Sequence, residues 1–299
     1  MEWAKYFQNE EYLEKTRLGM LLPEQRPLMQ TELNLADGCR ILDVGCGTGA
    51  FGGYLAEGLK GVSVTGLDND ETLIAFAREK WAQAENTFSF VTADAAELPF
   101  PDESFDAVVS HTFLTSMPEY KPALAEMKRV CRSGGSVASL AGMSFANTPF
   151  DKGVYPMEWK WRRRYRELFD KLWTMYQNLV PYQQFTRGAD PGRIPMLFSE
   201  MGFESVYVYP VGSFWSLSNA AVPKETRLRY IELDYASEMK RMEAVASLPG
   251  ADGYMSREEL SEMKTLLGVR RDALKESLDR NVFWEWAGNG NLLVIGRKA

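Results

Sequence analysis

The residues best placed to do chemistry are a glycine-dense turn and an aspartate some twenty positions after it. Gly45-Cys46-Gly47-Thr48-Gly49 directly follows the apolar stretch 39–44. Glycines at this spacing can adopt positive φ angles and leave backbone N–H groups bare for a carboxylate or a phosphate. Asp68 then stands where a carboxylate can accept hydrogen bonds from both hydroxyls of a ribose. Together these features predict a site for a ribose-containing ligand.

Two further aspartates narrow the choice of ligand. Asp43 lies inside the apolar stretch before the glycines, where it would repel a pyrophosphate but favour a cationic ammonium or sulfonium. Asp94 follows a later apolar stretch and can accept from the exocyclic amine of an adenine. The spacing Gly47-x-Gly49-x-x-Gly52 also matches the dinucleotide fingerprint, so a nicotinamide-dependent oxidoreductase is the alternative. That alternative is disfavoured because the chain offers no second phosphate clamp and no acid for a hydride site.

Elements that would position these residues alternate along the chain. Helical patterns separate the first strands, and this alternation predicts parallel βαβ units in a doubly wound, mostly parallel α/β sheet with helices on both faces. The pattern predicts seven strands: Cys39–Val44, Val62–Leu67, Phe88–Thr92, Phe105–Ser110, Ser136–Ala141, Phe203–Val211 and Asn291–Gly296.

The domain organisation follows from the same pattern. We expect an N-terminal helical cap at 1–37 and an α/β core, which binds the ligand, at 38–142. Helical insertions at 143–190 and 223–283 interrupt the core, which continues at 191–222 and ends with a last strand at 284–299. Because strands flank both insertions, we interpret them as a lid over the site and not as an independent domain.

Composition excludes several classes of protein. The chain has 299 residues, with 34 Lys+Arg against 41 Asp+Glu and a net charge of −7, which argues against nucleic-acid binding. Three cysteines and one histidine cannot form a disulfide framework or a multi-histidine metal site, so no metal is expected. The start of the chain is charged, and no stretch reaches the roughly 20 apolar residues of a membrane span. These observations predict a cytoplasmic protein without membrane contact.

Three segments carry a family resemblance. ILDVGCGTGAFGGYLA, VTGLDNDETLIAFAR and TADAAELPFPDESFDAVVSHTFL resemble the class I S-adenosylmethionine-dependent methyltransferases, in the small-molecule branch that includes ubiquinone and menaquinone biosynthesis enzymes. The resemblance covers about residues 38–142, with a weaker echo at 196–211. It implies a Rossmann-like methyltransferase fold that uses S-adenosylmethionine, releases S-adenosylhomocysteine and methylates a small molecule.

The resemblance also implies roles for individual residues. Asp43 would act on the amino group of the cofactor, Asp68 would hold its ribose hydroxyls, and Asp94 would read its adenine edge. We expect no nucleophilic role for Cys46, because similar sequences often carry cysteine in this turn without one. The full set implied to bind the cofactor is Asp43, Gly45, Cys46, Gly47, Asp68, Asn69, Asp94, Ala95 and Ser110.

Methyl transfer from a sulfonium is an in-line displacement, which needs an aligned acceptor and a water-poor pocket. A general base is needed only where the acceptor must lose a proton. His111, at the end of the fourth strand, is the candidate base, since its near-neutral pKa suits that role. The alternative is that His111 packs against the cofactor or caps the strand.

Aromatic residues in the insertions are the candidates for an acceptor pocket: Tyr155, Trp159, Trp215, Trp284 and Trp286. An aromatic stripe between 159 and 176 fits core packing better than a pocket, and the basic run 160–166 fits a solvated helix face better than a nucleic-acid contact. The acceptor atom stays open among O, N, S and C. The remaining alternatives are a cofactor-binding regulatory protein without turnover, and an RNA or protein methyltransferase.

Overall fold

The computed structural model describes residues 3–6, 8–149, 159–180, 188–215, 217, 222–278 and 287–299. The chain divides into two compact units, which are described separately. The core unit comprises 20–147, 183–213 and 289–299. The helical unit comprises 1–19, 148–182 and 214–288.

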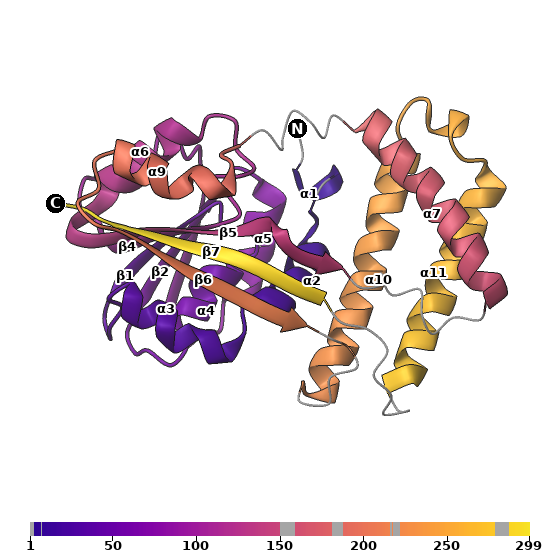
Figure 1. The fold of residues 1–299 in the computed structure, drawn as a ribbon, viewed down its shortest axis with the longest axis horizontal. Coiled ribbons are helices and arrows are strands. Elements are labelled where there is room, and N and C mark those ends of the chain that lie inside the picture. The colour runs from indigo at the N-terminus through magenta and orange to yellow at the C-terminus, as the bar shows by residue number, and fades with distance from the viewer. Residues whose placement is uncertain are drawn as a thin grey trace. The chain divides into compact units, whose positions relative to one another are not determined.

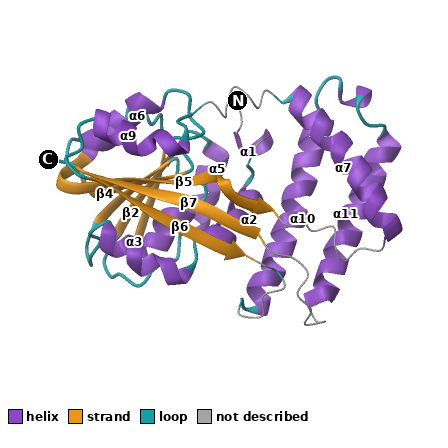
Figure 2. Cartoon of the chain, in the orientation of Figure 1, coloured by secondary structure: helices purple, strands orange, loops and turns teal. Residues whose placement is uncertain are grey.

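A twisted sheet forms the centre of the core unit (Figures 1 and 2). Among the described residues it has seven strands in the order β3-β2-β1-β4-β5-β7-β6. Their bounds are β1 Arg40–Val44, β2 Ser63–Asp68, β3 Thr87–Thr92, β4 Phe105–His111, β5 Cys131–Pro149, β6 Val206–Trp215 and β7 Ala287–Arg297.

Strand direction confirms the expected mostly parallel α/β sheet. The pairs β1–β2, β1–β4, β2–β3 and β4–β5 are all parallel. β7 runs against its neighbours: the end of β7 bonds the start of β5 (Lys298 N to Gly135 O, 3.1 Å) and the residue before β6 (Arg297 N to Ser205 O, 3.0 Å). The last two strands therefore form the antiparallel part of the sheet.

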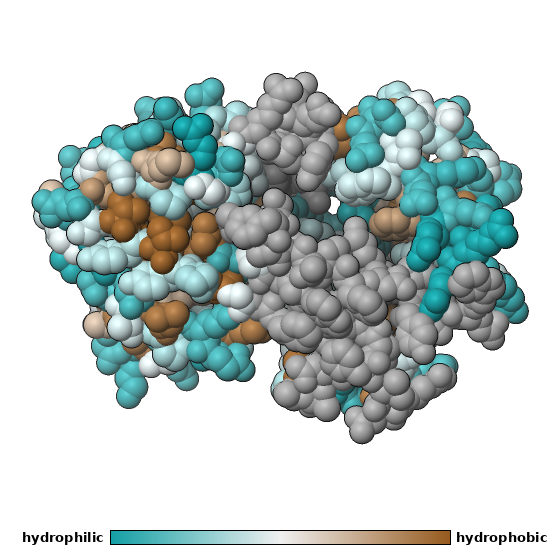
Figure 3. Space-filling model, in the orientation of Figure 1, coloured by the Kyte–Doolittle hydropathy of each residue, from teal (hydrophilic) through white to brown (hydrophobic). Residues whose placement is uncertain are grey.

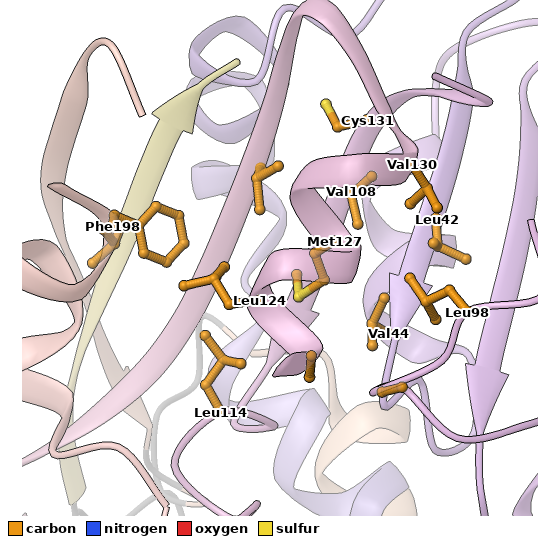
Figure 4. Packing of buried hydrophobic residues seen from close by; sticks show 14 of the residues in the cluster. Leu42, Val44, Leu98, Val108, Leu114, Leu124, Met127, Val130, Cys131 and Phe198 are labelled. Atoms are coloured by element: carbon orange, nitrogen blue, oxygen red, sulfur yellow. The ribbon is translucent and has the colours of Figure 1, made fainter. Parts of the chain in front are cut away.

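Helices cover the two faces of this sheet. On one face α6 (Tyr120–Val130) and α9 (Ile194–Glu200) pack against strand residues such as Val108, and Figure 4 shows Leu124 and Met127 of α6 in this cluster. On the other face α3 (Arg26–Glu32) and α4 (Ala50–Ala56) cover the alternate strand residues, among them Val109 and Leu293. α5 (Glu71–Lys80) packs beside β2 and β3. Residues of one strand thus face different helices in alternation.

The short 3₁₀ turns of the core unit, Pro23–Gln25 and Pro191–Arg193, each precede a helix of that unit. On the face shown in Figure 3, hydrophobic surface gathers on the core unit. The exposed large apolar side chains of this unit include Met196 of α9 and Val208 of β6.

In the helical unit, α7 (Trp159–Leu179), α10 (Lys224–Ala246) and α11 (Arg257–Leu278) pack together, and α1 (Trp3–Tyr6) contacts α10. α2 (Glu10–Met20) and the 3₁₀ turn Ala251–Gly253 complete its described elements. The aromatic stripe of α7 is largely interior, as Tyr165, Leu168 and Tyr176 show, while Trp161 and Trp173 stay exposed. Arg164 in the basic run pairs with Glu262 at 2.7 Å. Most of this stripe is therefore core packing.

A buried charge network ties α2 to the other helices of this unit. Lys15 donates to Asp234 at 2.9 Å, and Arg270 pairs with the other oxygen of the same carboxylate at 2.5 Å. Burial alone would raise the pKa of Asp234, but the two cations outweigh it and hold that pKa well below its usual range. The carboxylate of Asp234 thus stays ionised inside the unit.

The fifth strand differs most from its expected bounds. It was expected at Ser136–Ala141, yet β5 runs from Cys131 to Pro149, so residues 143–149 of the expected insertion continue the strand. At its start, Gly134 and Gly135 exchange backbone hydrogen bonds with Lys298, which keeps a turn-like sequence in the sheet. No described helix has the length and apolarity needed to cross a membrane.

Candidate functional site

The glycine turn connects β1 to α4 at the carboxyl edge of the parallel strands. Gly45, Gly47 and Gly49 all have positive φ, at 69°, 54° and 72°, as the sequence predicts. The prediction that their N–H groups are bare is wrong for part of the turn. The N–H groups of Gly45 and Cys46 donate to Leu67 O at 2.8 and 3.0 Å, and that of Gly47 donates to Asp68 Oδ2 at 2.9 Å. These bonds fasten the turn to the end of β2.

Asp68 is therefore the partner of the turn as well as the last residue of β2. Its second oxygen accepts from the N–H of Asp70 at 3.1 Å, and Asp70 in turn caps α5 by accepting from Thr72 N at 3.0 Å. Burial raises the pKa of Asp68, although the N–H donors of Gly47 and Asp70 oppose the shift. Hydroxyl donors or a cation at this carboxylate would relieve the cost of keeping it ionised.

Asp43 occupies the strand before the turn and is 1% exposed. Its Oδ2 accepts from the N–H of Gly52 at 2.9 Å. That N–H belongs to the first turn of α4, where Gly49 at the N-cap position provides no side-chain acceptor. The carboxylate thus fixes the start of the helix and places a negative charge behind the glycine turn.

The environment of Cys46 does not favour a reactive thiolate. Its side chain is buried against Ile74, Ala77 and Phe90. Burial raises its thiol pKa well above the usual value, and the negative charges of Asp43 and Asp68 add to the shift. The thiol is therefore uncharged at neutral pH, as expected for a residue without a nucleophilic role.

The adenine-edge candidates lie together at the ends of β2 and β3, which pair Asp68 with Thr92. Asn69 and Asp94 are exposed, whereas Ala95 is buried. Asp94 Oδ1 accepts from Ala96 N at 2.8 Å, which orders the loop after β3. The structure thus brings the three sequence candidates to one edge of the sheet.

Ser110 and His111 end β4 and point to opposite faces. Ser110 is fully buried on the α6 face, with Oγ 3.5 Å from Ala138 O. His111 is 3% exposed, and its ring centroid lies 5.4 Å from that of Phe51 on α4. His111 therefore shares the α4 side of the sheet with the helix that follows the glycine turn.

Two aromatic residues at the turn were missed by sequence reasoning. Trp81 Nε1 donates to Thr48 O at 3.0 Å, and its ring stacks on Phe88 with centroids 4.4 Å apart. A Cβ on Gly45 would lie 2.3 Å from the ring of Phe113, so that ring rests on the turn. The available signal was indirect: small residues in the turn and helix leave room for large ones elsewhere.

The side chains of the five aromatic pocket candidates all lie outside the described part of the structure. Tyr155, Trp284 and Trp286 lie outside the described residues. Trp159 begins α7 and Trp215 ends β6, and their side chains also lie outside the described part. Among the residues that are described, no group of three or more His, Cys, Asp or Glu could hold a metal ion.

Known proteins share both the sequence and the fold of this chain. A family described as a methyltransferase domain matches residues 42–139. The demethylmenaquinone methyltransferase of Staphylococcus aureus strain JH9 is 33% identical over 186 residues, which is 61% of this chain and 75% of the relative.

Two solved structures of Haemonchus contortus phosphoethanolamine N-methyltransferase 2 share the fold alone. One is in complex with S-adenosylhomocysteine and phosphomonomethylethanolamine, with a TM-score of 0.52 at 15% identity over 98% of this chain and 58% of that one. The other is in complex with S-adenosyl-L-methionine, with a TM-score of 0.51 at 16% identity over 99% of this chain and 59% of that one.

The chain belongs to the class I S-adenosylmethionine-dependent methyltransferases, and its core resembles that of the menaquinone enzymes. It is an enzyme that uses S-adenosylmethionine, and the resemblance found in the sequence is confirmed. The residues at the turn fit this cofactor, because the carboxylates of Asp43 and Asp68 suit a ligand with a cationic and a hydroxylated part.

Proposed function

We propose that this methyltransferase transfers the methyl group to a small-molecule acceptor by in-line displacement at the carboxyl edge of the core sheet, in a pocket covered by the helical insertions. The observation that carries the proposal is where the chain leaves the core. β5 ends at Pro149 and β6 ends at Trp215, both at the carboxyl edge, and the antiparallel β7 begins there at Ala287.

The point at which the chain re-enters the core after the first insertion also lies at the carboxyl edge of the sheet. Ala189 N donates to Leu114 O at 2.8 Å, just beyond the end of β4. A Cβ on Gly188 would lie 2.3 Å from the carbonyl carbon of Thr115, so only glycine allows this close approach. The contacts of Gly188 and Ala189 with the residues after β4 support the proposal that the first insertion returns to the core at the carboxyl edge.

We propose that the cofactor is bound by the residues that the family resemblance implies. This set begins with Asp43 in β1 and ends with Ser110 in β4. Asp68 is proposed to accept from the ribose hydroxyls and Asp43 to act on the amino group, while Asp94 and Ala95 read the adenine edge. S-adenosylmethionine supplies a methyl group on a cationic sulfur when bound. The buried carboxylate of Asp43 and the half-buried carboxylate of Asp68 would favour that positive charge.

His111 is proposed as the general base for an acceptor that must lose a proton. Two observations support this role: His111 ends β4, and its ring contacts Phe51 on α4, the helix that follows the glycine turn. The acceptor pocket is proposed to include the aromatic residues of the insertions, Tyr155, Trp159, Trp215, Trp284 and Trp286, because aromatic faces bind apolar and cationic groups.

A panel assay for S-adenosylhomocysteine release tests this function. The panel holds hydroxylated naphthalenes, which the name of the bacterial relative suggests, together with amines and thiols. Turnover on one class, with inversion at a chiral methyl group, is the expected result; retention would refute direct in-line transfer. His111→Gln should then lower kcat at neutral pH and flatten its acidic limb, whereas full activity with an unchanged pH profile would remove the base role.

A cytoplasmic location and the lack of nucleic-acid binding are also proposed; the small number of cysteines, three, supports the first, and the net charge of −7 supports the second. Strong, salt-dependent RNA binding would favour the RNA methyltransferase alternative instead.

A further inference from the structure

Thr112, the residue that follows β4, has a backbone conformation that threonine rarely adopts. Its φ is 55°, in the left-handed region. The backbone crowds a β-branched side chain there, so such a residue is a genuine outlier. Among the described residues Asn34 and Glu103 share this conformation, at 57° and 58°, but neither is β-branched. Strain of this kind persists only where the surrounding structure enforces it, and it is found most often at functional sites.

Hydrogen bonds on both sides of Thr112 enforce the bend. Its N–H donates to Leu140 O at 2.8 Å, which extends the pairing of β4 with β5 by one residue. Its carbonyl oxygen accepts from Thr115 Oγ1 at 3.0 Å and from Ser116 Oγ at 2.9 Å. Its own Oγ1 donates to His111 O at 2.7 Å. The bend is therefore fixed at the point where the chain leaves the sheet.

The bend moves the next side chain to the other face of the sheet. Side chains alternate along a strand, so an extended chain would put Phe113 on the same side as His111, the α4 side. Phe113 packs instead against the hydrophobic cluster on the α6 side, which includes Val108 and Leu124. The left-handed residue between His111 and Phe113 accounts for this change of side.

On the α6 side, Phe113 reaches the first glycine of the turn. A Cβ on Gly45 would lie 2.3 Å from Cδ2 and 2.7 Å from Cγ of the Phe113 ring, closer than a real Cβ comes to a neighbouring atom. The ring therefore fills the space that a side chain at this position would need. The N–H of Gly45 donates to Leu67 O at 2.8 Å. The start of the turn is thus held both by the end of β2 and by the residue that the bend after β4 directs onto it.

We propose that Thr112 is a positioning residue for the cofactor: its strained bend places Phe113 on Gly45 and so holds the glycine turn in the conformation that binds S-adenosylmethionine. Thr112 acts through Phe113 and does not touch the cofactor. This inference rests on the proposed function, since it takes the glycine turn as the cofactor site.

The test measures the affinity of S-adenosylhomocysteine for full-length variants by isothermal titration calorimetry. Thr112→Val should bind about tenfold more weakly than wild type, because it keeps the crowding of a β-branched residue but loses the hydrogen bond of Oγ1. Thr112→Asn should bind within about twofold of wild type, with an equal or higher Tm, because asparagine tolerates a left-handed φ. Thr112→Ala, which also lacks the hydroxyl, replaces Thr112→Val if the valine variant fails to fold.

A double variant tests whether Thr112 acts through Phe113. Phe113→Ala removes the ring from Gly45 and should weaken binding about as much as Thr112→Val does. Adding Thr112→Val to Phe113→Ala should then weaken binding no further, because the bend has no ring left to position. Changes that act through the same contact are not additive.

Asn34→Val is the matched control. It places a β-branched residue at a similar φ, 57°, in an exposed position just after α3. The neighbouring Leu33 accepts from Ser136, which pairs with Ala107 near the start of β4, so this bend lies at the opposite edge of the sheet. Asn34→Val should lower Tm and leave the affinity for S-adenosylhomocysteine unchanged, because it adds strain away from the turn.

Three results would overturn the proposal: Thr112→Val that binds like wild type, Thr112→Asn that binds as weakly as Thr112→Val, or losses in Thr112→Val and Phe113→Ala that add up in the double variant. Failure of wild type to bind S-adenosylhomocysteine would instead refute the cofactor site on which the proposed function depends.

Discussion

The indole N–H of Trp81 links the aromatic cluster of α5 and β3 to the glycine turn, and replacing Trp81 with Phe tests that link. The variant keeps a ring to stack on Phe88 but removes the hydrogen bond of 3.0 Å to Thr48 O. Thr48 is 1% exposed, so losing this bond to its carbonyl should cost about 1–3 kcal/mol. For a unit the size of the core, about 2 kcal/mol lowers Tm by roughly 4–8 °C.

The same change should weaken the cofactor site, because the turn it releases also carries the bond from Gly47 to Asp68. We expect S-adenosylhomocysteine to bind about tenfold more weakly to Trp81→Phe by isothermal titration calorimetry. Phe88→Leu is the matched control: it removes the stacked ring, worth about 0.5–1.5 kcal/mol, but keeps the N–H donor. Equal losses of affinity in both variants, or none in Trp81→Phe, would refute the coupling of Trp81 to the turn.

Further predictions concern three other positions. Cys46→Ala should keep kcat/KM within about threefold, because a thiol with a raised pKa is no nucleophile; a hundredfold loss would make it one. Gly188→Ala should lower the free energy of unfolding by about 1–3 kcal/mol in urea titrations, since its Cβ would meet Thr115 at 2.3 Å, and an unaffected variant would contradict this contact. Asp234→Asn should cost about 3–5 kcal/mol by leaving the Lys15 charge buried. Because the pKa of Asp234 is depressed, its stabilising effect is present above the ordinary aspartate pKa and is lost as pH falls below about 4, which circular dichroism of wild type against Asp234→Asn can follow.

The sheet and the glycine turn could be predicted because both depend on local pattern. Apolar stretches that alternate with helical spacing predict a parallel sheet. The glycines at 45, 47 and 49 predict the positive φ angles that the turn has. The aspartates could be placed for the same reason, since Asp43 and Asp68 lie near or at the carboxyl end of a strand and Asp94 follows one. Their presence at one edge is a consequence of parallel topology.

The contacts that hold the turn could not be predicted from local pattern. The bonds from Gly45 and Cys46 to Leu67 O depend on how β1 and β2 are staggered, and the bond from Gly52 to Asp43 depends on where α4 begins. Trp81 reaches Thr48 across 33 residues of sequence. No spacing rule encodes such long-range contacts.

The long fifth strand shows the limit of turn signals. The pair Gly134-Gly135 is locally typical of a turn outside a strand. The antiparallel partner at Lys298 nevertheless supplies hydrogen bonds that keep these glycines in the sheet. The bend at Thr112 was equally hidden, because threonine does not favour a positive φ and the contact of Phe113 with Gly45 depends on how the strands pack.

The most direct test of the cofactor site is the affinity of S-adenosylhomocysteine for wild type and for Asp68→Asn, measured by calorimetry at neutral pH. Removing the carboxylate charge that would accept from the ribose should weaken binding by about 10- to 100-fold, corresponding to about 1.5–3 kcal/mol. Asp106→Asn is the control, since Asp106 is ion-paired to Arg40 and Arg132 at the start of β4, the opposite edge of the sheet, and should bind like wild type. Equal affinity of wild type and Asp68→Asn would contradict a cofactor site at the end of β2.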